Sequence, residues 1–274
     1  MFTKNKKLYE ISLYPYRSLN KTDFFILMFA LGLISFIAGI IFMLKGAWPV
    51  FGFFGLDVLL VYIFFKINFK SGKKKEIIIV DDSSPDNTYG LVKNKFRAKK
   101  FIKIFSRKKE FSLAKAIGYG IKKSKGRLII VMDTDMTHNP NLITKLIGRS
   151  KNYDLVSASR FVKGGSMSNL FHYTCSLIFN FYLKTLLNSR LNDNLGGYFC
   201  VKRKTVMKVN FKKIFYGYGE YYFRLLFFLN KNKISMIEIP ALYNKRNSGE
   251  SKSNFFVLLF TYFIHAIILK FKNI

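Results

Sequence analysis

The sequence is poor in acidic residues, cysteine and histidine. Its 274 residues include 15 aspartates and glutamates against 46 lysines and arginines, with two cysteines and three histidines. No metal-type spacing surrounds Cys175 or Cys200, so we expect reduced, structural thiols rather than a disulfide framework or a thiolate metal site. The histidines are too scattered for a zinc-like cluster and stand at His138, His172 and His265.

Positive charge and apolar residues dominate the composition instead. The net charge is +31, and half of the residues are hydrophobic. This combination predicts a membrane protein with basic cytoplasmic parts, and the charge attracts lipid headgroups, phosphorylated substrates or nucleic acid. An AT-rich genome, which favours Lys, Asn, Ile and Phe, accounts equally for part of the basic excess. Neither a recognition helix nor an aromatic platform is recognisable, so we expect no nucleic-acid partner.

Two apolar runs near the N-terminus predict a transmembrane hairpin. The first, Phe24 to Leu44, carries no charge and has the length of about twenty residues that a bilayer-spanning helix needs. It is too long for a signal-peptide core. A short connector with Trp48 leads to the second run, Val50 to Phe65, which only Asp57 interrupts. Asp57 is either a functional acid inside the membrane or a residue paired against the neighbouring helix.

Basic residues on both sides of the hairpin set its expected orientation. They precede and follow the two runs, whereas the connector holds only Lys45. By the positive-inside rule, both ends of this multi-pass segment are predicted to be cytoplasmic. We therefore expect a membrane hairpin over residues 1–72, a second domain over 73–253 and an apolar C-terminal helix over 254–274.

From Glu76 onward, strand and helix patterns alternate as in an α/β domain with a mostly parallel sheet. Ile77 to Val80 reads as a buried strand that ends in two aspartates, and Leu128 to Met132 reads as another that ends in Asp-Thr-Asp. Between them, Leu113 to Lys123 has a helical apolar face. Open α/β sheets bind ligands at the carboxyl ends of their strands, which is where both acidic groups lie.

Two later apolar segments suit the membrane interface better than its core. Leu170 to Leu187 is interrupted by polar residues, so it predicts an interfacial helix, with an ordinary core helix as the alternative. Phe255 to Leu269 is short for a span and contains His265. We expect an interfacial or re-entrant helix, because a full span would carry Lys270 and Lys272 to the outside.

The acids after the second strand have the spacing of a metal site. In an extended segment alternate side chains share a face, so Asp133 and Asp135 can present oxygens to one hard cation. This is the geometry that a metal ion bridging a nucleotide diphosphate requires. A solvated turn is the alternative for an isolated Asp-x-Asp, but here a second acidic strand end, Asp81 and Asp82, comes before it.

With these motifs the chain, from about Glu76 to Ser253, resembles the family-2 glycosyltransferases. It is most similar to their dolichol-phosphate and polyprenyl-phosphate mannosyltransferase branch, which implies a GT-A-like fold. Beyond the acids, the resemblance rests on SASRF (157–161), GG (164–165), DNLGGY (193–198), GYGE (217–220) and RNSGESK (246–252). Residues 1–70 also resemble a bacterial integral-membrane family of unknown function, through PYRSL (15–19) and GAWPVFGFFGLDVLLVY (46–62). This resemblance implies a location in a bacterial inner membrane but no activity.

The resemblance implies roles for individual residues. Asp81 and Asp82 would contact the nucleoside, while Asp133 and Asp135 would hold Mg²⁺ or Mn²⁺ against the diphosphate. The residues expected to bind phosphate, in a mobile loop that closes over the donor, are Arg246 and Lys252. Arg160 would steady a phosphate or cap the strand before it.

The implied reaction is an inverting transfer of a hexose from a nucleotide sugar, of the GDP-mannose or UDP-glucose type, to a polyprenyl-phosphate or other lipid acceptor. An ionised phosphate acceptor needs positioning more than a general base, whereas a hydroxyl acceptor needs a carboxylate. The catalytic residues that we expect are Asp135, as a metal ligand, and Glu220 and Asp193. The last two are the candidates for that base or for a further metal contact. Either could instead be a structural acid paired with a basic residue.

The sequence departs from the family at its beginning. It has no counterpart of the first strand and helix, which supply the central strand of the sheet and part of the nucleotide pocket. Three explanations are open. The strand has been lost in a fusion protein that is inactive, the segment near Leu8 to Tyr14 provides a substitute strand, or the gene is misassembled. Relatives also place glycines near the donor where this chain has Phe111-Ser112-Leu113.

Overall fold

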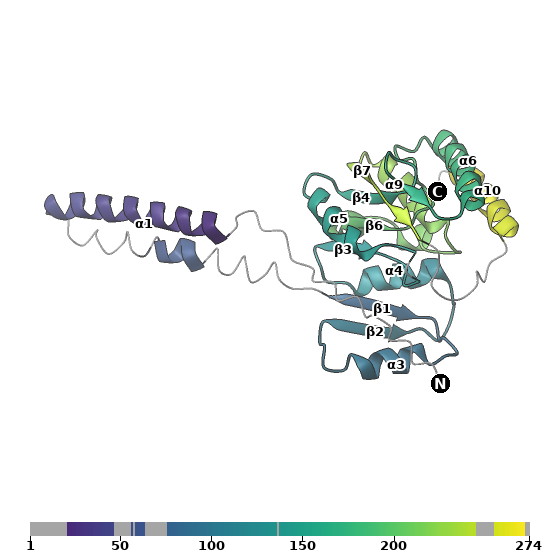
Figure 1. Cartoon of the computed structure of the whole chain (residues 1–274), viewed down its shortest axis with the longest axis horizontal. Helices are drawn as coiled ribbons and strands as arrows, with labels where there is room; N and C mark the ends of the chain where they lie inside the picture. The colour runs from purple at the N-terminus through teal and green to yellow at the C-terminus, as the bar shows by residue number, and fades with distance from the viewer. Residues whose placement is uncertain are drawn as a thin grey trace. The chain divides into compact units, whose positions relative to one another are not determined.

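The computed structural model describes residues 21–46, 56, 58–63, 76–135, 137–244 and 255–271. The chain divides into two units, one formed by Tyr14–Lys74 and the other by Met1–Leu13 together with Lys75–Ile274. The smaller unit contains the predicted membrane segment, and the larger one contains the strands (Figure 1).

In the smaller unit, helix α1 (Lys21–Leu44) confirms the first apolar run as a helix. Its segment Thr22–Leu44 has a mean hydropathy of 2.7 and is long and apolar enough to cross a bilayer. Large apolar side chains point outward, as with Phe29 at 74% exposure. Residues 56 and 58–63 are also helical, but the connector 47–55 and Asp57 lie outside the described residues, so the predicted hairpin is not shown.

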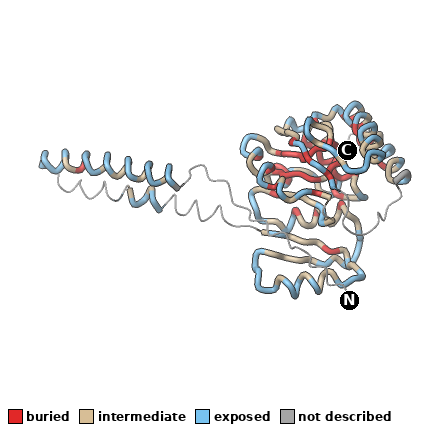
Figure 2. The backbone as a smooth tube through the Cα atoms, in the orientation of Figure 1, coloured by how far each residue is buried: buried red, intermediate tan, exposed pale blue. Residues whose placement is uncertain are grey.

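The larger unit is built on a four-stranded sheet in the order β3-β6-β4-β7. The four strands are β3 (Leu128–Val131), β6 (Phe199–Lys202), β4 (Leu155–Ser159) and β7 (Met236–Pro240). β4 is parallel to β7, with Leu155 opposite Met236, whereas β6 is antiparallel to both of its neighbours. Every residue of β4 is buried, which places the core around this strand (Figure 2).

A separate two-stranded sheet pairs β1 (Ile77–Asp81) with β2 (Ile102–Ser106) in parallel. Helix α3 (Thr88–Lys95) packs on β2, and helix α4 (Leu113–Lys123) leads from β2 to β3. The α4 start is fixed by Ser112, whose Oγ accepts a hydrogen bond from the Lys115 amide at 3.3 Å. Figure 1 shows α4 between the two sheets. A third, short pair joins β5 (Ser166–Met167) to β8 (Leu242–Tyr243).

The helices that follow β3 are α5 (Ile143–Arg149) after the 3₁₀ turn η1 (Pro140–Leu142), α6 (Leu170–Leu187), α7 (Arg203–Val206), α8 (Phe211–Ile214), α9 (Tyr221–Lys231) and α10 (Phe255–Phe271). Of these, α5 and α7 contact the four-stranded sheet. α6 and α10 lie side by side and share an apolar cluster with α9, through Leu183, Phe223 and Ala266. The helices predicted over residues 113–123 and 170–187 are confirmed at both ends. The strand predicted to end at Met132 ends one residue earlier.

Candidate active site

Two acidic pairs stand at the ends of strands β1 and β3, but they are held differently. At the end of β1, Asp81 is buried, and its Oδ2 accepts a hydrogen bond from the Ser84 amide at 3.2 Å. The Asp82 carboxylate accepts two hydrogen bonds from Arg107, from Nε at 2.6 Å and from a terminal nitrogen at 2.8 Å. It also accepts one from the Ser112 amide at 3.1 Å. Asp82 therefore fixes the segment that enters α4.

Arg107 is a site residue that no motif in the sequence predicts. Besides its two hydrogen bonds to Asp82, it donates hydrogen bonds to the carbonyls of Glu110 and Ser112. A bidentate guanidinium–carboxylate pair is geometrically well defined, so it sets the shape of the loop between β2 and α4. Its position directly after β2 is the one signal in the sequence that could have marked it.

At the end of β3, Asp133 and Asp135 stand in an open loop. The Asp133 side chain is 48% exposed. Asp135 Oδ1 accepts hydrogen bonds from the Thr137 amide at 3.1 Å and from its hydroxyl at 2.7 Å. These bonds fix one oxygen of Asp135 and hold the two acids in a defined loop at the end of the strand.

Behind Asp133 lies His138, which the sequence had suggested was merely one of three scattered histidines. It is buried between the rings of Tyr198 and Tyr243, at centroid distances of 4.8 and 4.7 Å. Its Nδ1 accepts a hydrogen bond from the Asp133 amide at 3.0 Å. Burial lowers the pKa of His138, against the opposing pull of Asp133 and Asp135. A neutral imidazole thus supports the backbone at the first acid.

The acids fit a hard divalent cation, with ligands from the donor completing its shell. Among the described residues, no three His, Cys, Asp or Glu side chains gather closely enough to hold a metal by themselves. Mg²⁺ is commonly held by one or two carboxylates together with phosphate oxygens and water. Asp133 and Asp135 match that smaller set.

A buried ion pair organises the neighbouring edge of the sheet. Asp193 is fully buried, and Arg160, directly after β4, is nearly so. The Asp193 carboxylate accepts hydrogen bonds from Arg160 Nε at 2.9 Å and from a terminal nitrogen at 2.8 Å. It also accepts hydrogen bonds from the backbone amides of Arg160 and Leu195. Burial disfavours the charge of Arg160, yet Asp193 raises the arginine pKa above its ordinary value.

Glu220 is also buried, in the loop that precedes α9. Its Oε2 accepts a hydrogen bond from the Tyr218 amide at 2.9 Å, and its Oε1 lies 3.2 Å from Nδ1 of His265 on α10. Gly217 has a φ of +74°, and a Cβ there would overlap Glu220 Oε1, which explains the glycine. The Gly219 amide donates to the Tyr262 hydroxyl at 3.0 Å. The C-terminal helix is thus joined to this loop.

Comparison with known proteins identifies the family. Residues 65–210, more than half of the chain, match glycosyl transferase family 2. The chain belongs to this family. Residues 13–85 match DUF2244, an integral membrane protein family, which together with α1 indicates a membrane protein.

Curated members of the family show moderate identity to this chain. A dolichol-phosphate mannosyltransferase of Pyrococcus furiosus is 32% identical over 68% of this chain and 52% of its own length. An undecaprenyl-phosphate mannosyltransferase of Micrococcus luteus is 26% identical over 65% of this chain and 76% of its own length. A polyprenol monophosphomannose synthase of Mycolicibacterium smegmatis is 26% identical over 64% and 69%, respectively. The chain therefore spans about half the length of the pyrococcal relative.

Solved structures confirm the GT-A-like fold. Glucosyl-3-phosphoglycerate synthase of Mycobacterium tuberculosis, in complex with Mn²⁺, UDP and phosphoglyceric acid, superposes with a TM-score of 0.53 at 14% identity. The match covers 71% of this chain and 67% of that one. Its complex with Mn²⁺ and UDP-glucose gives a TM-score of 0.51 at 13% identity, over 70% and 67%.

Within this family-2 domain the structure brings together some of the predicted residues. The pairs Asp81–Asp82 and Asp133–Asp135 follow two strands, and Asp193 joins Arg160. Glu220 adjoins Tyr221, whose pKa is raised by burial and, to a lesser degree, by the charge of Asp133. The predicted phosphate ligands Arg246 and Lys252 lie outside the described residues.

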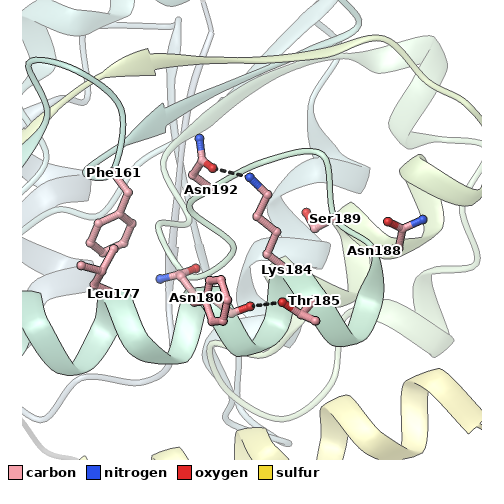
Figure 3. A pocket seen from close by; sticks show the side chains of 9 residues that line it. Phe161, Leu177, Asn180, Lys184, Thr185, Asn188, Ser189 and Asn192 are labelled. Carbon is pink, nitrogen blue, oxygen red and sulfur yellow. Dashed lines mark hydrogen bonds between the residues drawn. The ribbon is translucent and has the colours of Figure 1, made fainter.

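A cavity of about 410 Å³ runs along α6 (Figure 3). One end is apolar and the other carries amides, hydroxyls and a single ammonium group. Lys184 Nζ donates a hydrogen bond to Asn192 Oδ1 at 2.6 Å within it. The lining residues are Phe161, Leu177, Asn180, Phe181, Lys184, Thr185, Asn188, Ser189 and Asn192.

Proposed function

We propose that this protein is an inverting glycosyltransferase that moves a hexose from a nucleotide sugar to polyprenyl phosphate at the cytoplasmic face of a bacterial inner membrane. The observation that carries the proposal is the placement of Asp133 and Asp135 directly after β3 in a family-2 domain. The names of three relatives supply the acceptor class, since each is described as acting on, or making, a polyprenol phosphate derivative.

On the donor side, Asp133 and Asp135 would hold Mg²⁺ or Mn²⁺ against the diphosphate. When bound, this ion would offset the negative charge that develops on the leaving group. Arg246 and Lys252 would add two positive charges to the same group. Asp81, at the end of β1, would contact the nucleoside.

Asp82 would contribute to donor binding mainly by shaping the loop. Its carboxylate is already engaged by Arg107 and the Ser112 amide, so its hydrogen-bonding capacity is largely used inside the protein. We infer that Asp82 and Arg107 together set the loop before α4, where relatives carry glycines.

On the acceptor side, the attacking oxygen of a lipid phosphate is already ionised, so the reaction needs alignment rather than proton removal. This fits the observed state of the two candidate bases. Asp193 is enclosed by hydrogen-bond donors, and Glu220 is buried against His265 and Tyr218. We propose that both act as positioning residues. Arg160, neutralised by Asp193, would likewise orient the segment after β4 rather than bind a free phosphate.

Exposed apolar side chains on α6 and α10 would face the lipid. Leu170, Phe171, Ile178 and Phe181 on α6 are largely exposed, as are Phe260 and Phe271 on α10. Leaving so many large apolar groups in water is unusual for a soluble domain, and the two helices lie side by side. We propose that this pair lies in the membrane interface and that the cavity along α6 receives the polar end of the acceptor.

The test is transfer of labelled sugar from GDP-mannose or UDP-glucose to polyprenyl phosphate, in membranes that contain the chain and Mn²⁺. We expect label in solvent-extractable lipid, with the product anomer opposite to that of the donor. Chelator, Asp133→Asn and Asp135→Asn should each abolish the label. Asp154→Asn is the matched control, because Asp154 precedes β4 and pairs with Lys202 at 3.0 Å. Absence of transfer with both donors, where an intact relative works, would support an inactive fusion protein instead.

A further inference from the structure

Tyr243, the second residue of β8, lies buried at a point where three segments of the site meet. The residue is 8% exposed. It contacts His138 in the loop after β3, Arg160 directly after β4, and Gly196 in the segment that follows Asp193. No motif in the sequence predicts a role for this tyrosine. Each of its contacts reaches a different part of the site.

The first contact joins Tyr243 to the loop that carries the metal-binding acids. The rings of Tyr243 and His138 meet edge to face, with centroids 4.7 Å apart, and the two backbones form an antiparallel bridge. Beside this bridge, the Asn244 amide donates to the Thr137 carbonyl at 3.1 Å. His138 Nδ1 accepts the Asp133 amide, so the neutral ring carries its proton on Nε2, which lies 3.9 Å from Asp133 Oδ2. Tyr243 thus fixes the ring that supports Asp133.

The second contact joins Tyr243 to the buried ion pair. The guanidinium carbon of Arg160 lies 5.1 Å from the centroid of the Tyr243 ring. A cation over an aromatic ring is attracted by the quadrupole of the ring, and more strongly where both are withdrawn from water. The same guanidinium donates two hydrogen bonds to Asp193. The Tyr243 ring therefore stabilises the arginine in the position where it holds Asp193.

The third contact is made by the Tyr243 hydroxyl, which donates a hydrogen bond to the Gly196 carbonyl at 3.0 Å. Burial raises the pKa of Tyr243, so the hydroxyl keeps its proton and remains a donor. The turn fits closely here, because a Cβ on Gly196 would lie 3.0 Å from this hydroxyl and 3.2 Å from Asp193 Oδ2. In the same turn the Leu195 amide donates to Asp193 Oδ1 at 3.2 Å. Tyr243 thus also supports the turn that carries Asp193.

We propose that Tyr243 is a positioning residue that holds the metal side and the acceptor side of the site in one arrangement. Its ring acts on Asp133 through His138, and its ring and hydroxyl act on Asp193 through Arg160 and Gly196. The inference rests on the proposed function, which assigns Asp133 to the metal and Asp193 to the acceptor side. An inverting displacement needs the attacking oxygen and the leaving group in line, so the two sides must keep a fixed relation.

Three substitutions separate the contacts. Tyr243→Phe removes only the hydroxyl, and His138→Phe removes the Nδ1 acceptor but keeps an aromatic ring. Tyr243→Leu removes both the ring and the hydroxyl of the tyrosine. Tyr222→Phe is the matched control, because it also removes a buried tyrosine hydroxyl, which donates to Ser157 Oγ at 2.6 Å within the core.

Hydrogen exchange on the full-length chain in nanodiscs reports on the two sides separately, through the amides of Asp133 and Leu195. We expect the Leu195 amide to exchange roughly tenfold faster in Tyr243→Phe, with Asp133 unchanged. His138→Phe should give the reverse, and Tyr243→Leu should accelerate both amides. Both amides in Tyr222→Phe should match the parent, and the β4 amides should stay protected in all variants.

Binding of Mn²⁺ in the presence of GDP or UDP, followed by electron paramagnetic resonance, gives a second measurement. We expect the Kd for Mn²⁺ to rise roughly tenfold in His138→Phe and in Tyr243→Leu, because both lose the support of Asp133. Tyr243→Phe keeps the ring and should bind Mn²⁺ like the parent. In transfer assays, Tyr243→Phe should raise KM for polyprenyl phosphate and leave KM for the donor unchanged.

Unchanged exchange of both amides in Tyr243→Leu overturns the inference. So does faster exchange that extends to β4 in every Tyr243 variant, since that result means a general structural role. Equal Mn²⁺ affinity in all the proteins, or no binding to any of them, overturns the link to Asp133. If exchange and Mn²⁺ binding follow the expected pattern but no sugar is transferred, the proposed function fails and the positioning by Tyr243 stands.

Discussion

Removing the charge of Asp193 should destabilise the larger unit strongly, because Arg160 would keep a buried charge without a partner. The side chains of Arg160 and Asp193 are 7% and 0% exposed, and two hydrogen bonds join them. Breaking such a pair by removing one partner costs about 3–5 kcal/mol. The variant Asp193→Asn keeps the side-chain shape, so the loss is electrostatic. For a unit of this size, we expect the melting temperature to fall by roughly 10 °C.

Differential scanning calorimetry in detergent is the suitable assay, because the sequence has a single tryptophan, Trp48, which belongs to the smaller unit and does not report on the larger one. Asp154→Asn is the control. Asp154 pairs with Lys202, but both side chains are about one quarter exposed, so its loss should cost no more than about 1 kcal/mol. The double variant Arg160→Met with Asp193→Asn should recover part of the lost stability, since no uncompensated charge remains.

Equal and small effects of Asp193→Asn and Asp154→Asn would refute this reasoning. That result would mean that the Asp193 carboxylate is not committed to Arg160 and is available for proton transfer. A large loss of stability, partly restored in the double variant, would instead confirm the positioning role. Activity alone cannot separate these roles, because an unfolded enzyme and one without a base are both inactive.

Two further substitutions test the loop before α9 and the α6 face. Gly217→Ala should lower stability by about 2–3 kcal/mol, measured by calorimetry, because the residue has a left-handed backbone and its Cβ would displace Glu220. Gly148→Ala, in α5 with open space around it, should be neutral or stabilising, and an equal loss in both would contradict this explanation. Phe181→Glu should raise KM for polyprenyl phosphate roughly tenfold, with KM for the donor unchanged. Thr144→Glu places the same charge on an exposed turn of α5 and should leave both constants unchanged, so similar effects would argue against a lipid-facing α6.

The sequence predicts local features of this fold well. The helices at 113–123 and 170–187 are predictable from their apolar residues, and the structure adds the side chains that cap their starts, Ser112 and Asn169. The acids at the strand ends are visible because they adjoin their strands in the chain. The direction of β6 is not predictable in this way, since an apolar strand pattern is the same for parallel and antiparallel pairing.

Partners far apart in the chain are also beyond sequence reasoning. Arg107 and Asp82 are 25 residues apart, and Arg160 and Asp193 are 33 apart. No local pattern links such residues, so a buried structural acid and a catalytic acid look alike in the sequence. Asp193 can be interpreted as a positioning residue and not as a base only when its hydrogen-bond donors are known.

The same reasoning applies to Glu220 and suggests a second role for helix α10, beside the lipid contact that we propose for it. His265 and Tyr262 of α10 contact Glu220 and Gly219, while other residues of α10 are exposed and apolar. A helix that lies in lipid and also holds this loop would keep the loop in place only while the lipid contact persists. Because burying apolar area in lipid contributes free energy in proportion to that area, membrane contact would stabilise the ordered loop. The buried acid would then be most firmly positioned at the membrane surface, where the proposed lipid acceptor would be bound.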